Sequence, residues 1–151
     1  MRIAFFQPDI PQNVGAAIRL AACFGVPFDI IEPCGFPLTG KEIRRVAMDY
    51  GALAQVHRHA SFAAWQNTEP GSRTVLLTTR GAEPLWDFTF RPDDRLLLGR
   101  ESAGVPDEVH DSADARVVIP LSGAARSLNV VMTAGIALGE AIRQTRHCGA
   151  T

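Results

Sequence analysis

The stretch IPLSGAARSLN, residues 119–129, joins an apolar run to a long apolar segment. A β-strand ending at Val117–Ile119 leads into Pro120 and a small loop that contains a glycine. At the end of the loop, Ser127 or Asn129 is placed to cap a following helix. Ligands of α/β proteins bind at such strand ends, where loops offer free backbone N–H and C=O groups. We therefore expect a ligand-binding loop here.

A second loop of the same kind lies a short way upstream, in LLLGRESAGVP at residues 96–106. A hydrophobic strand is again followed by glycines and polar side chains, from Gly99 to Gly104. Glycine at such a position permits unusual φ angles and a close approach of a ligand to the backbone. Two ligand-type loops so near each other favour an enzyme.

Strand-like and helix-like segments alternate, which is typical of an α/β protein with a largely parallel sheet. The length suits one domain over residues 1–151. Helices are predicted from Asn13 to Gly25 and over about 40–50, 61–67, 106–112 and 127–146. Strands are predicted at Ile3–Phe6, Phe28–Ile31, Thr74–Leu77, Leu96–Leu98 and Val117–Ile119, with a weaker one around Ala54–Val56.

The first and last predicted helices carry position-specific signals. Asn13 is a good N-cap for the first helix, and Gly25 stops it. The last helix is apolar on every face from Leu128 to Leu138, so both of its sides must be covered. Gly135 and Gly139 would let another backbone approach closely. We expect a homodimer through this helix, the alternative being burial within one chain.

Composition limits the possible partners. The net charge of −1 does not favour nucleic-acid binding, so any RNA-binding surface must come from local clusters. Three cysteines without a CxxC pair suit a reducing cytoplasm better than a disulfide framework. We expect neither a membrane span nor a signal peptide. Candidate basic clusters, each also explicable as a solvated helix face or end, are Lys41, Arg44 and Arg45; His57, Arg58 and His59; and Arg143, Arg146 and His147.

Several common site types are disfavoured. The chain has no GxGxxG after its first strand and no GxxxxGK[ST], which argues against a standard dinucleotide enzyme or P-loop NTPase. His57 and His59 have no third ligand in sequence reach, so we expect an exposed pair and no metal site. Ser102 and Ser122 lack a nucleophile elbow and a paired histidine, which makes hydrolase chemistry weak.

Three polar motifs together have a specific resemblance. They are NxGxxxR at residues 13–19, LLLGxExxGxP at 96–106 and IPxxGxxRSLN at 119–129. Over nearly the whole chain they resemble the SPOUT superfamily of RNA methyltransferases. Within it the chain is similar to the minimal, single-domain TrmL (YibK) type, which modifies the wobble ribose of tRNA. The segments that fit this type are QPDIPQNVGAAIRLAACFGVPFDIIEPCGF, RRVAMDY and LTTRG.

The resemblance implies an α/β domain whose C-terminal segment is threaded through a loop as a deep trefoil knot, a rare exception to the rule against knots. It also implies that the knot loops bind S-adenosylmethionine in a bent shape, leaving S-adenosylhomocysteine as product and requiring no metal. By position the cofactor contacts would be Leu77, Thr78, Gly99, Glu101, Ile119, Leu121, Ser127 and Leu128.

The implied reaction is transfer of the sulfonium methyl to a ribose 2′-OH, for which the protein aligns the hydroxyl and assists loss of its proton. Arg19 matches the arginine that the family places beside the target hydroxyl. Because an arginine pKa exceeds about 12, holding the adjacent phosphate and stabilising alkoxide charge suit it better than a general-base role. Asn13 and Asn129 would support this arrangement. Glu101 would orient Arg19 or contact the cofactor, the alternative being to cap N–H groups of its own loop.

The implied substrate is the wobble cytidine or uridine in the anticodon stem-loop of tRNA, with leucine isoacceptors as candidates, read as single-stranded bases on a small surface. Alternatives are the same chemistry on another RNA such as rRNA, a non-catalytic RNA- or nucleotide-binding module, and an unrelated small-molecule enzyme. The sequence departs from many relatives at Val131, Met132 and Gly139, while Glu140 is retained.

Overall fold

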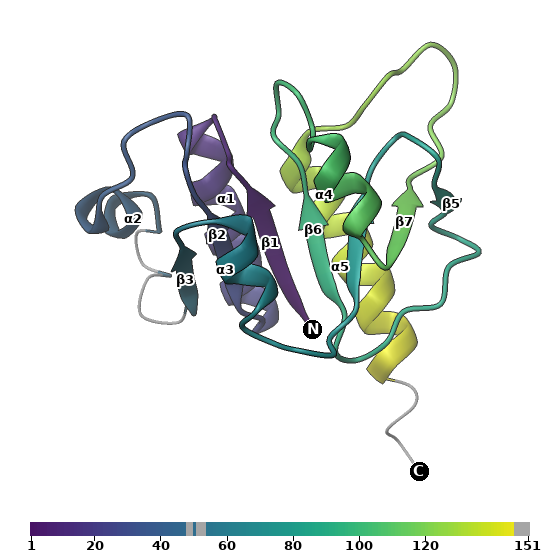
Figure 1. The fold of residues 1–151 in the computed structure, drawn as a ribbon, viewed down its shortest axis with the longest axis horizontal. Helices are drawn as coiled ribbons and strands as arrows, with labels where there is room; N and C mark the ends of the chain where they lie inside the picture. Colours follow the sequence, from purple (N-terminus) through teal and green to yellow (C-terminus); the bar gives the residue numbers. More distant parts are fainter. Residues whose placement is uncertain (48–49, 51–53, 147–151) are drawn as a thin grey trace.

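The computed structural model describes residues 1–47, 50 and 54–146, and it contains a seven-stranded, wholly parallel sheet (Figure 1). The strand order is β3-β2-β1-β6-β4-β7-β5. The strands are β1 (Arg2–Phe6), β2 (Phe28–Ile31), β3 (Val56–His59), β4 (Thr74–Leu77), β5 (Glu83–Pro84), β6 (Arg95–Leu98) and β7 (Ala115–Val118). The helices are α1 (Pro11–Phe24), α2 (Gly40–Ala47), α3 (Phe62–Gln66), α4 (Asp107–Ser112) and α5 (Val130–Arg146). The predicted α/β class with a parallel sheet is confirmed.

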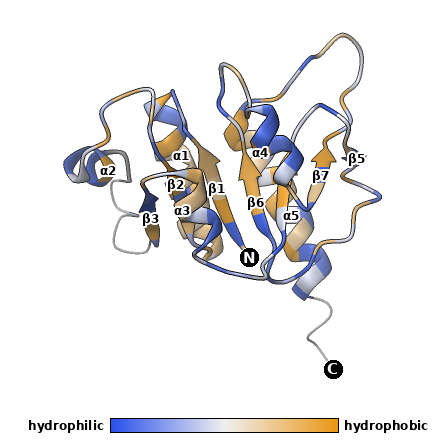
Figure 2. Cartoon of the chain, viewed as in Figure 1, coloured by the Kyte–Doolittle hydropathy of each residue, from blue (hydrophilic) through white to orange (hydrophobic). Residues whose placement is uncertain are grey.

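The helices cover both faces of the sheet. In each of the strands β2, β4 and β6 all four residues are buried, as expected for parallel strands that are covered on both sides. On one face, α1 and α5 pack in a large apolar core with side chains such as Ile3, Phe28 and Leu96. On the other face, α3 and α4 pack around Trp65 and Leu97. In Figure 2 the central strands β1 and β6 are mostly hydrophobic, in agreement with this layering.

Two predicted helix starts are wrong. The first helix begins at Pro11 with Ile10 at the N-cap position, and no side chain caps it. Proline is favoured in the first turn of a helix, where its missing N–H costs no hydrogen bond. Asn13 therefore lies inside α1 and does not have the predicted capping role. The last helix begins at Val130, after the predicted Ser127. Asn129 caps it, because its Oδ1 accepts from the backbone N–H of Val131 at 2.8 Å.

Other predictions fit the observed elements more closely. Gly25 ends α1 in the left-handed conformation, with φ of 65°, as its position predicts. The predicted helix at 40–50 is observed as Gly40–Ala47. Part of the predicted remainder lies outside the described residues, and so do part of the RRVAMDY segment and Cys148. The short exposed strand β5 was not predicted. Within the described ranges, no helix has the length and apolar character that crossing a bilayer requires.

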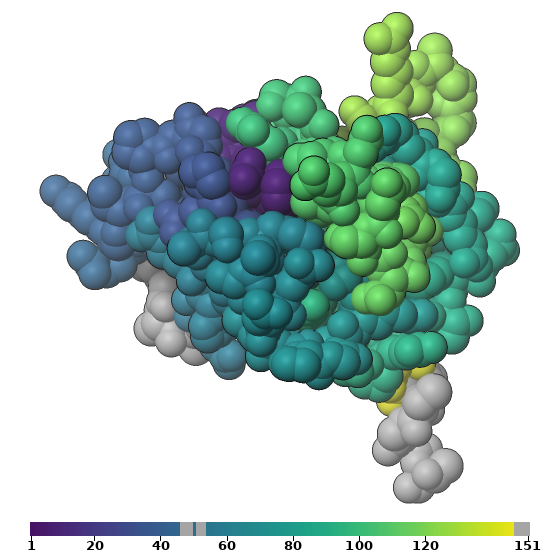
Figure 3. Space-filling view, in the orientation of Figure 1, coloured from purple at the N-terminus to yellow at the C-terminus, as the bar shows by residue number. Residues whose placement is uncertain are grey.

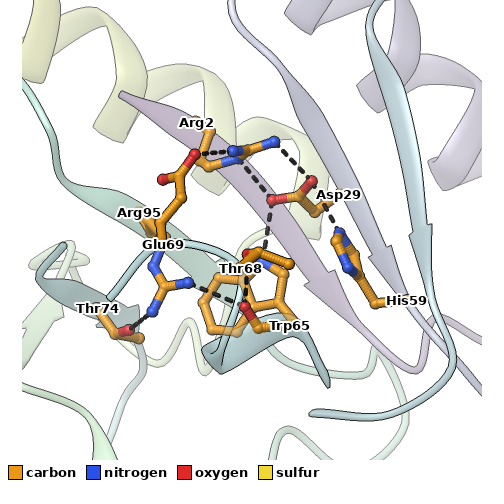
Figure 4. Close-up of polar contacts among 8 residues, drawn as sticks. All are labelled: Arg2, Asp29, His59, Trp65, Thr68, Glu69, Thr74 and Arg95. Carbon is orange, nitrogen blue, oxygen red and sulfur yellow. Dashed lines mark hydrogen bonds and ion pairs between the residues drawn. The ribbon is translucent and has the colours of Figure 1, made fainter. Parts of the chain in front are cut away.

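A buried polar cluster lies toward the amino-terminal ends of the central strands (Figure 4). The fully buried Asp29 accepts from Trp65 Nε1 at 2.9 Å and lies 2.7 Å from Nε of Arg2. His59 Nε2 lies 3.1 Å from Asp29, so this histidine is part of the cluster. Arg95 stacks over the Trp65 ring, with its guanidinium carbon 4.1 Å from the ring centroid. The cluster ties β1, β2, β3 and β6 to α3.

The opposite, carboxyl-terminal edge of the sheet positions the candidate site. Strands β6, β4 and β7 are neighbours and parallel, so Leu98, Leu77 and Val118 end at the same edge. The loops that follow them are therefore brought together, although they are distant in sequence. Helix α1, which follows β1, begins at this edge as well.

Candidate active site

A cavity of about 480 Å³ lies at this edge, between the loops that follow β4, β6 and β7 and the start of α5. Its size is within the range of small-molecule sites, and its lining mixes apolar side chains with a few polar ones. All eight residues predicted as cofactor contacts lie in its wall: Leu77, Thr78, Gly99, Glu101, Ile119, Leu121, Ser127 and Leu128. The structure thus brings together cofactor-contact segments that the sequence separates by up to about a third of the chain.

Gly99 is required by a close approach of two backbone segments. A Cβ at this position would lie 2.6 Å from the carbonyl carbon of Gly104, a distance that real side chains do not tolerate. Arg100 and Gly104 exchange two backbone hydrogen bonds of 2.8 Å, which close the loop. Gly104 has φ of 66°, where glycine is favoured. The loop after β6 is therefore tightly constrained.

A chain of side-chain hydrogen bonds links the three sequence motifs. Asn129 Nδ2 donates to Asn13 Oδ1 at 3.1 Å, and Asn13 Nδ2 donates to Glu101 Oε1 at 3.1 Å. The second Glu101 oxygen accepts from the backbone N–H of Asp9 at 3.0 Å. Three of the predicted catalytic residues thus form one network at the cavity wall. The Glu101 carboxylate accepts from the loop before α1, and a backbone hydrogen bond at Glu101 itself also lowers its pKa, in agreement with the suggestion that it caps its own loop.

Asp9 adds a second carboxylate beside Glu101, which the sequence did not single out. Burial and the neighbouring Asp9 carboxyl raise the pKa of Glu101, whereas hydrogen bonds with Glu101 and Ser102 lower the pKa of Asp9. Ser102 donates to Asp9 Oδ2, and Arg100 Nε lies 3.8 Å from that same oxygen. A Cβ on Gly35 would lie 2.6 Å from the Asp9 Cβ, so glycine there makes room for Asp9.

Arg19 is not brought into the cavity wall. It lies on the exposed side of α1, where its guanidinium carbon is 4.7 Å from the centroid of the Tyr50 ring. Arg19 Nη2 also donates to Tyr50 Oη at 3.4 Å. The prediction that Glu101 orients Arg19 is wrong within the described structure, because the Glu101 carboxylate bonds to Asn13 and Asp9.

The chain matches a family model described as the SpoU rRNA Methylase family over residues 1–139. It belongs to this family. The match includes all three motifs and the hydrogen-bonded network that joins them, so the family assignment and the geometry of the cavity refer to the same part of the chain.

Proteins with assigned functions in this family include close relatives. A protein of Beijerinckia indica named tRNA (cytidine(34)-2′-O)-methyltransferase is 58% identical over 94% of this chain and 90% of its own. One of the same name from Ancylobacter novellus is 53% identical over 96% and 93%. The Escherichia coli protein of that name is 34% identical over 99% and 97%.

Solved structures in the family share the fold. One, described as giving insight into the 2-OH methylation of C/U34 on tRNA, has a TM-score of 0.88 and 39% identity, covering 95% of this chain and 94% of its own. AviRb of Streptomyces viridochromogenes, solved in complex with the cofactor AdoMet, has a TM-score of 0.81 and 26% identity. That match covers 99% of this chain and 61% of AviRb. The SPOUT methyltransferase fold predicted by resemblance is confirmed.

Proposed function

We propose that this protein transfers the methyl group of S-adenosylmethionine to the ribose 2′-OH of the wobble nucleotide, cytidine or uridine, in tRNA. The single observation that carries the proposal is the network from Asn129 through Asn13 to Glu101 in the wall of the cavity. It unites all three motifs at one place. The names of the similar proteins supply the substrate and the position that is modified.

The cavity suits S-adenosylmethionine in size and chemistry. Leu77, Ile119 and Leu121 offer apolar surface to an adenine ring, while the loop backbones offer hydrogen-bond partners for its edge and for the ribose. The tight turn at Gly99 leaves the loop after β6 without a side chain at its entry to the cavity. The cofactor supplies an activated methyl group on a sulfonium sulfur. The protein therefore needs to hold and align more than to activate.

The residues of the network have separable roles in the proposed reaction. Asn13 and Asn129 hold each other and border the cavity, so they fix the geometry in which a ribose hydroxyl would be placed. Glu101, whose pKa is raised by burial and by Asp9, is the titratable group of the network that would take up the hydroxyl proton. The Arg19 guanidinium would hold a phosphate next to the target ribose.

Arg19 can serve that role from outside the cavity wall. It follows Asn13 by six residues, which is about 9 Å along the helix axis. An RNA strand that crosses the exposed side of α1 would thus reach both the cavity edge and the guanidinium. We expect Arg19→Ala to abolish methylation while cofactor affinity, measured by calorimetry, stays nearly intact; methylation at the wild-type rate would contradict the role.

A homodimer through α5 is part of the proposal. In the single chain this helix buries Ala134, Ala137 and Leu138 but leaves Met132 59% exposed and Leu128, just before it, 37% exposed. Gly139 has open space where a Cβ would be. A second copy packed on this side would cover the apolar surface and agree with the expectation from the sequence.

The remaining elements of the proposal follow from the resemblance. They are recognition of the anticodon stem-loop, a cytoplasmic location, a single domain over residues 1–151 and a deep trefoil knot formed by the C-terminal segment. The compact cavity edge and the small size of the chain fit a small, accessible RNA target.

The same chemistry on rRNA is a second candidate. It is favoured by the description of the family model and by an AdoMet-bound rRNA methyltransferase from Sinorhizobium meliloti, with a TM-score of 0.80 and 28% identity. However, this chain covers only 55% of the Sinorhizobium meliloti structure, whereas it covers 94% of the structure concerned with C/U34 on tRNA. The coverage therefore favours the tRNA substrate.

The test is an assay with purified protein, S-adenosylmethionine and either unmodified bulk tRNA or rRNA. After digestion, mass spectrometry should locate a new 2′-O-methyl group on the wobble nucleotide of tRNA. Methyl transfer only to rRNA would replace the proposed substrate, and transfer to neither RNA by folded protein would overturn the proposed activity.

A further inference from the structure

The cations of this protein fall into two groups, with and without a partner. Many arginines are occupied: Arg73 bonds to Asp94 at 2.8 Å, and Arg116 donates to backbone carbonyls. In the described ranges 1–47, 50 and 54–146, by contrast, Lys41, Arg44 and Arg45 have exposed side chains with no ion pair or side-chain hydrogen bond. Three unpartnered cations therefore gather on the single helix α2.

This cluster differs from the other two basic clusters in that its cations have no partners among the described residues. In the second, Arg58 pairs with Glu32, and His59 contacts the buried Asp29. In the third, Arg143 pairs with Glu140 at 2.8 Å, and His147 lies outside the described residues. Only the α2 cluster, of the three, presents all its cations to solvent without a partner in the part of the chain that the structure describes.

The sequence of α2 fixes which way these charges point. Ile43 packs against the apolar core beside α1, so Lys41, Arg44 and Arg45 lie away from it. Glu42 exchanges hydrogen bonds of 3.2 Å with Thr39 at the start of the helix, so its carboxylate is engaged there. Figure 2 shows α2 as mainly hydrophilic, and in Figure 3 its segment forms a projecting end of the molecule.

The cations of α2 repel one another weakly, although Arg44 and Arg45 lie in the last turn, where the helix dipole favours positive charge. Like charges three and four residues apart on a helix, as Lys41 is from Arg44 and Arg45, destabilise the helix by a few tenths of a kcal/mol per pair, roughly. The whole chain carries a net charge of −1, so the cluster is a local feature and does not reflect a basic composition. Such a local field attracts a polyanion and steers its approach.

The cluster adjoins the candidate active site through α1. Helix α2 packs against α1, whose exposed side carries Arg19 stacked on Tyr50. The same helix α1 supplies Asn13 to the cavity wall. A continuous path therefore leads from the cavity edge along the exposed side of α1 to α2.

We propose that α2 is the surface that holds the phosphate backbone of the RNA substrate beyond the modified nucleotide, with Lys41, Arg44 and Arg45 as the phosphate contacts. The proposal rests on the proposed function and adds to it where the RNA lies. Evenly spaced phosphates on a strand that passes Arg19 match a row of unpartnered cations, whereas base-specific contacts are not required of them.

The experiment compares two double variants with the same change in net charge. R44A/R45A removes two cations of the α2 cluster, and R58A/R91A removes one ion-paired and one exposed arginine elsewhere. For each, tRNA affinity is measured by fluorescence anisotropy over a series of salt concentrations, together with methylation kinetics, S-adenosylmethionine affinity and circular dichroism.

For R44A/R45A we expect the slope of log affinity against log salt to become shallower by about 2, because each lost phosphate contact removes about 1. The KM for tRNA should rise about tenfold, which corresponds to about 1.4 kcal/mol of binding free energy. The kcat at saturating tRNA, the cofactor affinity and the helix content should stay unchanged. R58A/R91A should leave the slope unchanged.

The outcomes distinguish the two proposals. If the salt slope of R44A/R45A equals that of wild type, or if both double variants make the slope shallower by the same amount, α2 is not the RNA surface. Its cations would then bind another anion, such as an acidic protein. If wild-type protein binds tRNA with the expected dependence on α2 but leaves the wobble 2′-OH unmethylated, the surface stands and the proposed function fails.

Discussion

The two edges of the sheet hold polar networks of opposite design. At the amino-terminal side, the carboxylate of Asp29 is fully buried and faces cations and donors, namely Arg2, His59 and the Trp65 indole (Figure 4). At the carboxyl-terminal edge, two carboxylates, Asp9 and Glu101, lie beside each other, and Glu101 borders the cavity. The first network surrounds one carboxylate with cations and donors, whereas the second sets two carboxylates beside each other, with Arg100 Nε 3.8 Å from Asp9.

The two networks suit different roles, the first in holding the fold together and the second in the proposed reaction. A buried carboxylate that is paired and hydrogen-bonded holds the elements around it in place. Two neighbouring carboxyl groups shift each other's pKa, as Asp9 and Glu101 do, and such shifts are frequent at active sites. We therefore expect substitutions at the two edges to affect different measurements.

The largest effect is expected for Asp29→Ala. The change leaves the Trp65 N–H without its acceptor and the Arg2 guanidinium with Glu69 alone among the described residues. It should lower the free energy of unfolding by about 3–5 kcal/mol, measured by urea denaturation. The control is Asp107→Ala, which removes the exposed pair with Arg80 and should cost less than about 1 kcal/mol. Equal costs for the two variants would contradict the structural role of the Asp29 cluster.

Asn13→Ala tests the opposite edge. It removes both the acceptor of Asn129 and a donor to Glu101, so the catalytic geometry is lost and single-turnover methylation should fall by about 10²-fold. The free energy of unfolding should change by only about 1 kcal/mol. A variant that is destabilised as strongly as Asp29→Ala, or that keeps its methylation rate, would show that this network is structural.

Gly99→Ala tests the loop after β6. The added Cβ would collide with the Gly104 backbone, and the resulting shift should weaken S-adenosylmethionine binding by about 1–3 kcal/mol, measured by calorimetry. Gly40→Ala is the control, because a Cβ there meets only the end of the Arg44 side chain at 3.9 Å. Unchanged affinity in Gly99→Ala would remove this loop from the cofactor site.

The smallest effect concerns pH. The raised pKa of Glu101 means that its contribution to stability is present below its unfolded pKa and is lost as pH rises through the folded value. The lowered pKa of Asp9 acts oppositely: its contribution is present above its unfolded pKa and is lost as pH falls through the folded value.

Asp9→Asn should therefore lower the pKa of Glu101 toward its ordinary range without fully restoring it, because burial remains. Titration of the glutamate carboxyl carbons by NMR measures this shift, and the exposed Asp93→Asn provides the control. A Glu101 pKa that stays constant in Asp9→Asn would show that the two carboxyls are not coupled, and one that rises would contradict the expected direction of the coupling.

Much of the fold could be predicted because the strands are runs of consecutive buried residues. Thr74–Leu77 and Phe28–Ile31 agree with the observed strands at every residue. The helix start at Pro11 was missed because Asn13 has a typical capping side chain, while its actual partners, Glu101 and Asn129, are 88 and 116 residues away. Local patterns cannot reveal partners at such separations.

The candidate site shows the same limit. The eight predicted cofactor contacts lie around one cavity because each follows or ends a strand, and parallel strands place such residues at one edge. Asp9 was missed because nothing in QPDIP marks a carboxylate whose neighbour Glu101 lies 92 residues further along the chain. The sequence also could not show why glycine is required at position 99, because the requirement comes from the nearby Gly104 backbone and not from the φ angle of Gly99.

The most direct test of the account is mass spectrometry of tRNA from a strain that lacks the gene. We predict that the wobble nucleotide loses its 2′-O-methyl group and regains it when the wild-type gene, but not the Asn13→Ala variant, is restored. Wobble nucleotides that are unaltered in the deletion strain would contradict the proposed function.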